Sequence, residues 1–203
     1  LSAEKMLELA LDVSTVELFS PVGLDLSMSG IFDGKTAHKL FSEWTKDGLI
    51  ECAKIPYIAV AYDLEKQCPI LITTGSFADA MRASSSLPYI FAPYQVGRYL
   101  FVDGGVTHPL PLAFAPKVPG DITIAVNVLP SISMNAEIMH KESSFKRKRI
   151  LRHEVLIHSM MQNQAFIAIQ AMLQYQPDIY IEASHPKLKF TDLKKAEEFA
   201  QYG

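Results

Sequence analysis

Residues 82–88 read RASSSLP, residues 91–93 read FAP and residues 101–106 read FVDGGV. The third stretch places one carboxylate, that of Asp103, where a short apolar strand predicted at 99–102 ends at two glycines. Glycine adopts backbone angles that other residues avoid, and it allows a second chain or a substrate to approach closely. A carboxylate at this point is held by a rigid strand and stays accessible, which is typical of a functional position.

The composition predicts a compact domain without a membrane span. Of the 203 residues, 49% are hydrophobic and 20% are charged, which is enough apolar material for one core in a single domain over 1–203. The net charge of −3 argues against binding to nucleic acid. Cys52 and Cys68 lie sixteen residues apart without a partner pattern, so they predict neither a disulfide framework nor a zinc site. No stretch of about 18 uncharged apolar residues occurs, as a membrane-spanning helix would require.

The apolar segments predict an α/β architecture. Residues 57–62, 70–73, 99–102 and 122–128 are short, apolar and rich in β-branched or aromatic side chains, which favours buried strands. Helical patterns separate several of them, and this alternation predicts layers of helices around a largely buried sheet. The longest helical pattern, 150–175, is apolar over more than one face, so we expect protein to cover most of it.

Residues 131–149 are polar and predict an exposed or mobile loop that ends in the basic run KRKR at 146–149. Clustered lysines and arginines attract anionic lipid, so this run is a candidate for transient contact with a membrane surface. A short run of charges in a polar loop is more often simply solvated, and this interpretation is preferred.

The three stretches around Asp103 together resemble the motifs of the patatin-like phospholipases, a family of lipid acyl hydrolases. In that family the Asp of an Asp-Gly-Gly turn partners a nucleophilic serine, and an Ala-Ser-x-x-x-Pro block with a following Phe-x-Pro precedes it at a similar interval. The positions that match are Ala83, Ser84, Pro88, Phe91, Pro93, Asp103, Gly104, Gly105 and Pro111.

The resemblance implies a fold and a set of site residues. The implied fold is a three-layer α/β/α sandwich with a mostly parallel central sheet. The implied catalytic residue is Asp103, supported by the motif glycines Gly104 and Gly105. No metal and no organic cofactor is implied, and the implied substrate is a lipid ester. His108 is close enough in sequence to suggest a triad, but the resemblance implies a dyad without histidine.

The nucleophile motif of the family is missing from the chain. Neither Gly-x-Ser-x-Gly nor a preceding Gly-rich loop occurs. Ser76 follows Gly75 and Ser29 precedes Gly30, but neither serine has glycines two positions away on both sides. The opening of the chain at Leu1 resembles the helix that follows the nucleophile in this family. We therefore expect a C-terminal portion of the domain, incomplete at the N-terminus, that is inactive alone. An unpaired strand edge in such a piece would favour self-association.

The expected function of the full-length protein is hydrolysis of lipid esters by a serine-dependent carboxylic ester hydrolase that uses a Ser-Asp dyad. The alternative is a non-catalytic patatin-like module that binds lipid or a partner. The expected location is the cytoplasm or a membrane surface, and secretion stays open because a signal peptide would precede this sequence.

Two further segments have competing interpretations. Pro88, Ile90, Phe91 and Tyr94 either line a cleft for an acyl chain or close the core. Residues 33–36 read DGKT, like the end of a phosphate-binding loop, but the position that must be glycine is Ser29. We interpret 33–36 as a turn and the start of a helix.

Overall fold

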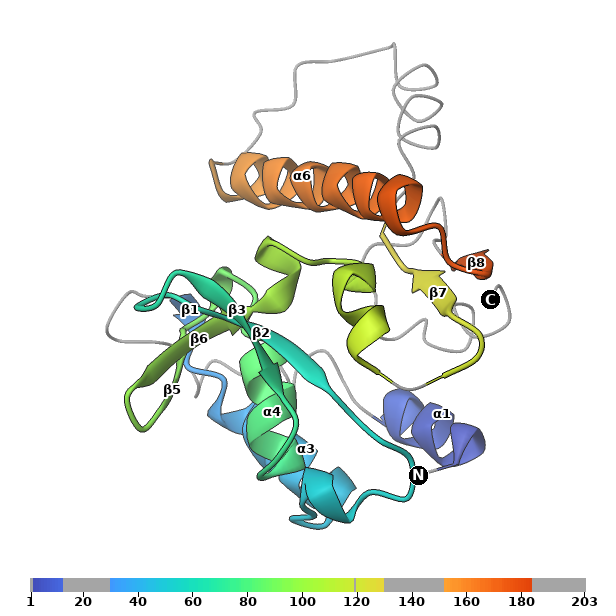
Figure 1. Cartoon of the computed structure of the whole chain (residues 1–203). Helices are drawn as coiled ribbons and strands as arrows, with labels where there is room; N and C mark the ends of the chain where they lie inside the picture. Colours follow the sequence, from blue (N-terminus) through green and yellow to red (C-terminus); the bar gives the residue numbers. More distant parts are fainter. Residues whose placement is uncertain (1, 13–29, 119, 130–151, 184–203) are drawn as a thin grey trace. The chain divides into compact units, whose positions relative to one another are not determined.

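The computed structural model describes residues 2–12, 30–118, 120–129 and 152–183 (Figure 1). These residues form two compact units, which divide between Val106 and Thr107 and are described separately below. The single domain expected over 1–203 stays a prediction. The loop expected at 131–149, with its basic run, lies outside the described residues.

The main sheet of the first unit has the strand order β3-β2-β6-β5. Its strands are β2 (Ala59–Asp63), β3 (Cys68–Ile72), β5 (Tyr94–Val96) and β6 (Tyr99–Asp103). Every neighbouring pair in this sheet is antiparallel, so the predicted mostly parallel sheet is wrong for this part of the chain. The reason is the length of the connections, because β2–β3 and β5–β6 are joined by four and two residues. A parallel pair needs a crossover of a dozen residues or more.

Parallel pairing does occur in two short ladders of the described residues. Strand β1 (Gly30–Phe32) pairs with β4 (Tyr89–Phe91) in the first unit. Strand β7 (Ile124–Asn127) pairs with β8 (Ile179–Glu182) in the second. Long connections that contain helices separate the partners in both cases. The α/β class is therefore confirmed, while the three-layer sandwich stays a prediction.

The helices of the first unit begin at recognisable signals. Helix α1 (Ala3–Asp12) starts after Ser2, whose Oγ accepts a hydrogen bond from the Lys5 amide at 3.3 Å. Helix α3 (Lys35–Thr45) starts at the turn predicted for 33–36, and α4 (Phe77–Ser84) starts after Ser76, which caps the Asp79 amide. The described part of the unit also contains two short 3₁₀ turns, η2 (Ile50–Cys52) and η3 (Gly104–Val106).

Helix α4 lies against one face of the main sheet (Figure 1). Ala80 packs with Ile50 and Ala59. Ala83 packs with Ala61 and Phe101. Small side chains at both contacts allow the helix backbone to approach the sheet closely, and this approach positions the residues that follow α4 beside the end of β6.

The described residues of the second unit form η4 (Leu112–Lys117), β7, the long helix α6 (Arg152–Tyr175) and β8. Its core gathers Leu110, Leu112, Ala125 and Ala168, with Leu129, Met172 and Tyr180 packed around them. The expectation that protein covers most of α6 is wrong for the described residues, because Leu156, Phe166 and Leu173 are each more than half exposed. The apolar pattern of a helix does not by itself specify how many neighbours pack on it. No described helix is long and apolar enough to cross a membrane.

Gly34 joins β1 to α3 at a point where no other residue fits. Its φ is 72°, in the left-handed region, and a Cβ built on it would lie 2.1 Å from Nη2 of Arg82. The Asp33 carboxylate accepts a hydrogen bond from the Lys35 amide at 2.9 Å, which completes the turn. The turn and helix start predicted for this segment are confirmed.

We predict that Gly34→Ala destabilises the protein much more than Gly97→Ala. Gly97 also has a left-handed φ of 57°, but open space surrounds its missing Cβ. Gly97→Ala should therefore lower the free energy of unfolding by about 1–2 kcal/mol from backbone strain. Gly34→Ala should lose about 1–3 kcal/mol more, because the methyl group displaces Arg82. Urea denaturation of both variants measures the difference, and equal losses would contradict the close approach.

Candidate active site

Asp103 is the last residue of β6 and is held by two backbone hydrogen bonds. Its amide donates to the Ser86 carbonyl at 3.0 Å, and its Oδ1 accepts from the Gly105 amide at 2.6 Å. Within the described part of the chain, Oδ2 accepts no hydrogen bond. The half-buried carboxylate is thus fixed in direction through one oxygen, and the other oxygen is left for a further donor.

Gly104 allows this strand end to rest on β2. A Cβ built on Gly104 would lie 2.3 Å from the Val60 carbonyl oxygen, well inside contact distance. In the ladder, Asp103 is paired with Ala61. The two motif glycines therefore have different roles, because Gly104 provides space and Gly105 provides the N–H that orients the carboxylate.

Burial raises the pKa of Asp103, while the hydrogen bond from the Gly105 amide acts in the opposite direction. An ordinary aspartate, with a pKa near 3.9, is a weak acceptor for a proton from a hydroxyl group. Desolvation disfavours the charged carboxylate and so makes it a stronger base. The site supplies a carboxylate adapted to accept a proton, which is the property expected of a general base.

The serines that precede the site have structural partners. The Ser84 hydroxyl donates to the Val60 carbonyl at 2.8 Å. The fully buried Ser86 hydroxyl donates to the Arg82 carbonyl at 2.7 Å and accepts from Nη1 of Arg82. These hydroxyls fix the segment between α4 and β6. Because each donates its proton to a backbone carbonyl, neither is placed to act as the nucleophile.

Arg82 is a structural residue of the site whose role sequence reasoning missed. Its side chain is only 1% exposed. Nε donates to the Gly34 carbonyl at 3.2 Å, and Nη2 donates to the carbonyls of Asp33 and Ala92, both at 3.0 Å. Burial lowers the pKa of Arg82. The sequence offered one signal for this role, which is an arginine directly before the small residues Ala83 and Ser84. A charged side chain among small core residues is almost never buried without partners.

The four candidate cleft residues pack around Arg82 or lie near it in the chain. The Phe91 and Tyr94 rings lie 5.2 and 5.3 Å from the Arg82 guanidinium carbon. Ile90 is buried, and Pro88 is half-buried. None of the four lines the cavity of the second unit beside Leu112 or the groove of the first unit beside Ile70. Their contacts fit the core-closing interpretation, and the acyl cleft stays a prediction.

His108 has partners of its own within the second unit. Its Nδ1 lies 2.9 Å from the Thr107 hydroxyl, and its ring packs on Phe114 with the centroids 4.8 Å apart. Burial lowers the pKa of His108, which favours the neutral ring. These contacts support a structural role for the residue.

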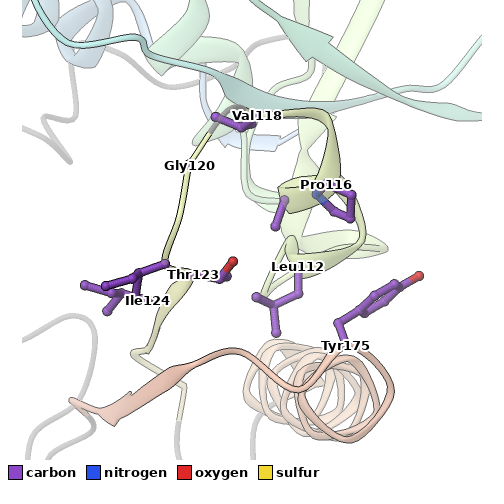
Figure 2. Close-up of a pocket in the computed structure, with 9 residues that line it drawn as sticks. Leu112, Pro116, Val118, Gly120, Thr123, Ile124 and Tyr175 are labelled. Carbon is purple, nitrogen blue, oxygen red and sulfur yellow. The ribbon is translucent and has the colours of Figure 1, made fainter.

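The second unit contains a cavity of about 660 Å³ (Figure 2). Its lining includes Leu112, Pro116, Thr123, Ile124 and Tyr175, and Leu112 lies next to the Tyr175 ring. Among the described residues that line it there is no carboxylate, histidine, lysine or arginine. The size of this cavity alone therefore does not make it a reaction site, and the candidate site stays at Asp103.

Comparison with known families identifies the chain. The family model of the patatin-like phospholipases matches residues 3–116, which is more than half of the chain. The chain belongs to the patatin-like phospholipase family. The matched segment contains the Asp103 turn, the main sheet and helix α4 of this patatin-like chain.

Similar curated proteins have been described as uncharacterized NTE family proteins. One is from Mycobacterium bovis and two are from strains of Mycobacterium tuberculosis, and each is 42% identical to this patatin-like chain over 79 residues. The aligned segment covers 39% of the chain and 22% of each relative. The chain thus spans about a fifth of the length of these relatives.

The raised pKa of Asp103 predicts a specific pH dependence of stability. A raised pKa in the folded state stabilises the protein below the unfolded pKa of about 3.9, and this contribution is lost as the pH rises through the folded pKa. The Asp103→Asn variant lacks this titration. Its free energy of unfolding, relative to that of the wild type, should therefore rise from about pH 4 upward and then level off.

Urea denaturation of both proteins between pH 3 and pH 8 measures this difference. A difference that does not change with pH would show that burial does not perturb Asp103. A difference that falls as the pH rises would show that the Gly105 hydrogen bond outweighs burial.

Proposed function

We propose that the full-length protein is a serine-dependent lipid acyl hydrolase in which Asp103 accepts the proton of the nucleophile. One observation carries the proposal: a half-buried carboxylate, oriented by the Gly105 amide, has a raised pKa and one oxygen without a hydrogen bond among the described residues. The position of Asp103 inside the segment matched by the family supports the same role. For the complete domain we also propose the three-layer α/β/α arrangement.

In the proposed reaction, Asp103 carries one proton between oxygen atoms. The serine oxygen attacks the acyl carbonyl carbon as its proton moves to the carboxylate. Collapse of the tetrahedral intermediate breaks the ester C–O bond, and the proton passes from Asp103 to the departing alcohol. Water then attacks the acyl-serine with Asp103 again as the acceptor, which releases the carboxylic acid and restores the serine.

The proposal requires a nucleophile and oxyanion donors from outside these 203 residues. The sequence contains no Gly-x-Ser-x-Gly, and the described serines nearest in sequence to Asp103, which are Ser84, Ser85 and Ser86, each donate to a backbone carbonyl. Backbone N–H groups aimed at the developing oxyanion account for a large part of catalysis in acyl transfer. We expect the 203-residue chain alone to show no esterase activity above that of a heat-inactivated sample.

The test is the Asp103→Asn variant of the full-length protein, assayed with a p-nitrophenyl ester and with a phospholipid. The amide keeps the shape of the side chain but cannot accept the serine proton. We expect kcat to fall by about 10²–10⁴-fold, as is typical when a general base is lost.

Asp63→Asn is the matched control. Asp63 is fully buried on the neighbouring strand β2, where its Oδ1 accepts from the amides of Glu65 and Lys66 at 3.0 and 3.4 Å. An amide oxygen preserves these bonds, while the amide nitrogen takes the place of Oδ2, which is buried without a partner among the described residues. This variant should therefore lose some stability and keep its kcat per folded molecule. Normal turnover by Asp103→Asn would remove Asp103 from catalysis. An inactive wild-type protein that still binds lipid would favour the non-catalytic module.

A further inference from the structure

A second candidate ligand site lies in the first unit, beside helix α4 on the face of the main sheet against which α4 packs. It is a groove of about 340 Å³, close to the lower limit for small-molecule pockets. Ile70, Ile72 and Phe101 contribute apolar side chains from the sheet, and Ala80 and Ala83 form the wall on α4.

One end of the groove is cationic. Tyr99 lines the groove at the start of β6, and its ring has the Lys66 ammonium 4.3 Å and the Arg98 guanidinium carbon 5.5 Å from its centroid. Lys66 and Arg98 belong to the two tight turns that join β2 to β3 and β5 to β6. A hydrogen bond from Arg98 and the charge of Lys66 lower the pKa of Tyr99, so the positive field reaches the groove.

Two carboxylates, those of Asp79 and Glu65, lie at or near the groove, and each has its own neighbours. Asp79 lines the groove from α4, and its carboxylate accepts a hydrogen bond from the Tyr94 hydroxyl at 2.6 Å and lies 2.8 Å from Nε2 of His38. Glu65 is exposed in the same turn as Lys66. The two turns therefore carry two cations and one anion in Lys66, Arg98 and Glu65, and an anionic ligand would avoid the side of Asp79.

We propose that this groove binds one long-chain carboxylate, with the chain over the apolar floor and the carboxylate between Lys66 and Arg98. Charge complementarity distinguishes this ligand from a neutral lipid, because a neutral head group would gain no electrostatic attraction from the two cations. The proposed ligand has the chemistry of the acid that the proposed hydrolase releases. The assignment rests on the groove itself and does not require that Asp103 is catalytic.

The test uses the full-length protein and dodecanoate below its micellar concentration, measured by isothermal titration calorimetry. We expect Lys66→Gln and Arg98→Gln each to weaken binding by about three- to tenfold, as for partly exposed charge-assisted contacts. Val96→Glu should abolish detectable binding, because it adds a carboxylate to an exposed lining position on β5. Dodecanol and hexanoate should each bind at least tenfold more weakly than dodecanoate.

A double variant, Lys5→Gln with Lys39→Gln, is the matched control. It also removes positive charge, from exposed side chains that pair with Glu8 and Glu43 and do not line the groove. This variant and Asp103→Asn should both keep the affinity for dodecanoate. The second result separates the groove from the proposed catalysis, because either proposal can then fail alone.

Three results would overturn the proposal. One is an affinity for dodecanoate that is unchanged in Lys66→Gln, Arg98→Gln and Val96→Glu. Another is equal affinity for dodecanol and dodecanoate, which would remove the role of the cations. The third is binding only to anionic phosphatidylserine vesicles and not to monomeric dodecanoate, which would make the two turns a membrane contact.

Discussion

The buried guanidinium of Arg82 is the interaction on which the geometry of the first unit depends. An arginine charge without partners would destabilise the interior by several kcal/mol, on the order of the whole stability of a domain. The Arg82 side chain therefore stays buried only while the carbonyls of Asp33, Gly34 and Ala92 keep their positions as its acceptors. A planar fork of donors suits several fixed carbonyls at once, which a lysine does not. The β1–α3 turn, helix α4 and the segment after β4 are joined through this one group.

The same interaction extends to the candidate active site. Ser86 bonds Arg82 through its hydroxyl and accepts the Asp103 amide through its carbonyl. Gly104 then rests on the carbonyl of Val60, and the Gly105 amide orients the carboxylate. The carboxylate is thus positioned by backbone groups that the fold has already fixed. Such preorganisation costs nothing at the moment of reaction, which is why sites on rigid elements are effective.

The arrangement of the main sheet also explains the cationic end of the groove beside α4. Two tight turns place Lys66 and Arg98 beside the same ring, although they lie 32 residues apart in the sequence. Helix α4 presents alanines to the sheet and covers only part of its face. The antiparallel order of the strands, which differs from the parallel sheet expected, is what brings these two turns together.

The sequence by itself determined the features that depend on neighbouring residues. The apolar runs located β2, β3, β6, β7 and the helix α6 to within a few residues, and the DGKT turn started α3 as expected. Asp103 and the two glycines that follow it are also neighbours in the sequence, so this local pattern was enough to mark the candidate site. Only the tertiary structure decided the antiparallel pairing, the exposure of α6 and the role of Arg82. The partners of Arg82 at Asp33 and Gly34 are 49 and 48 residues away, and local periodicity contains no information about contacts at that separation.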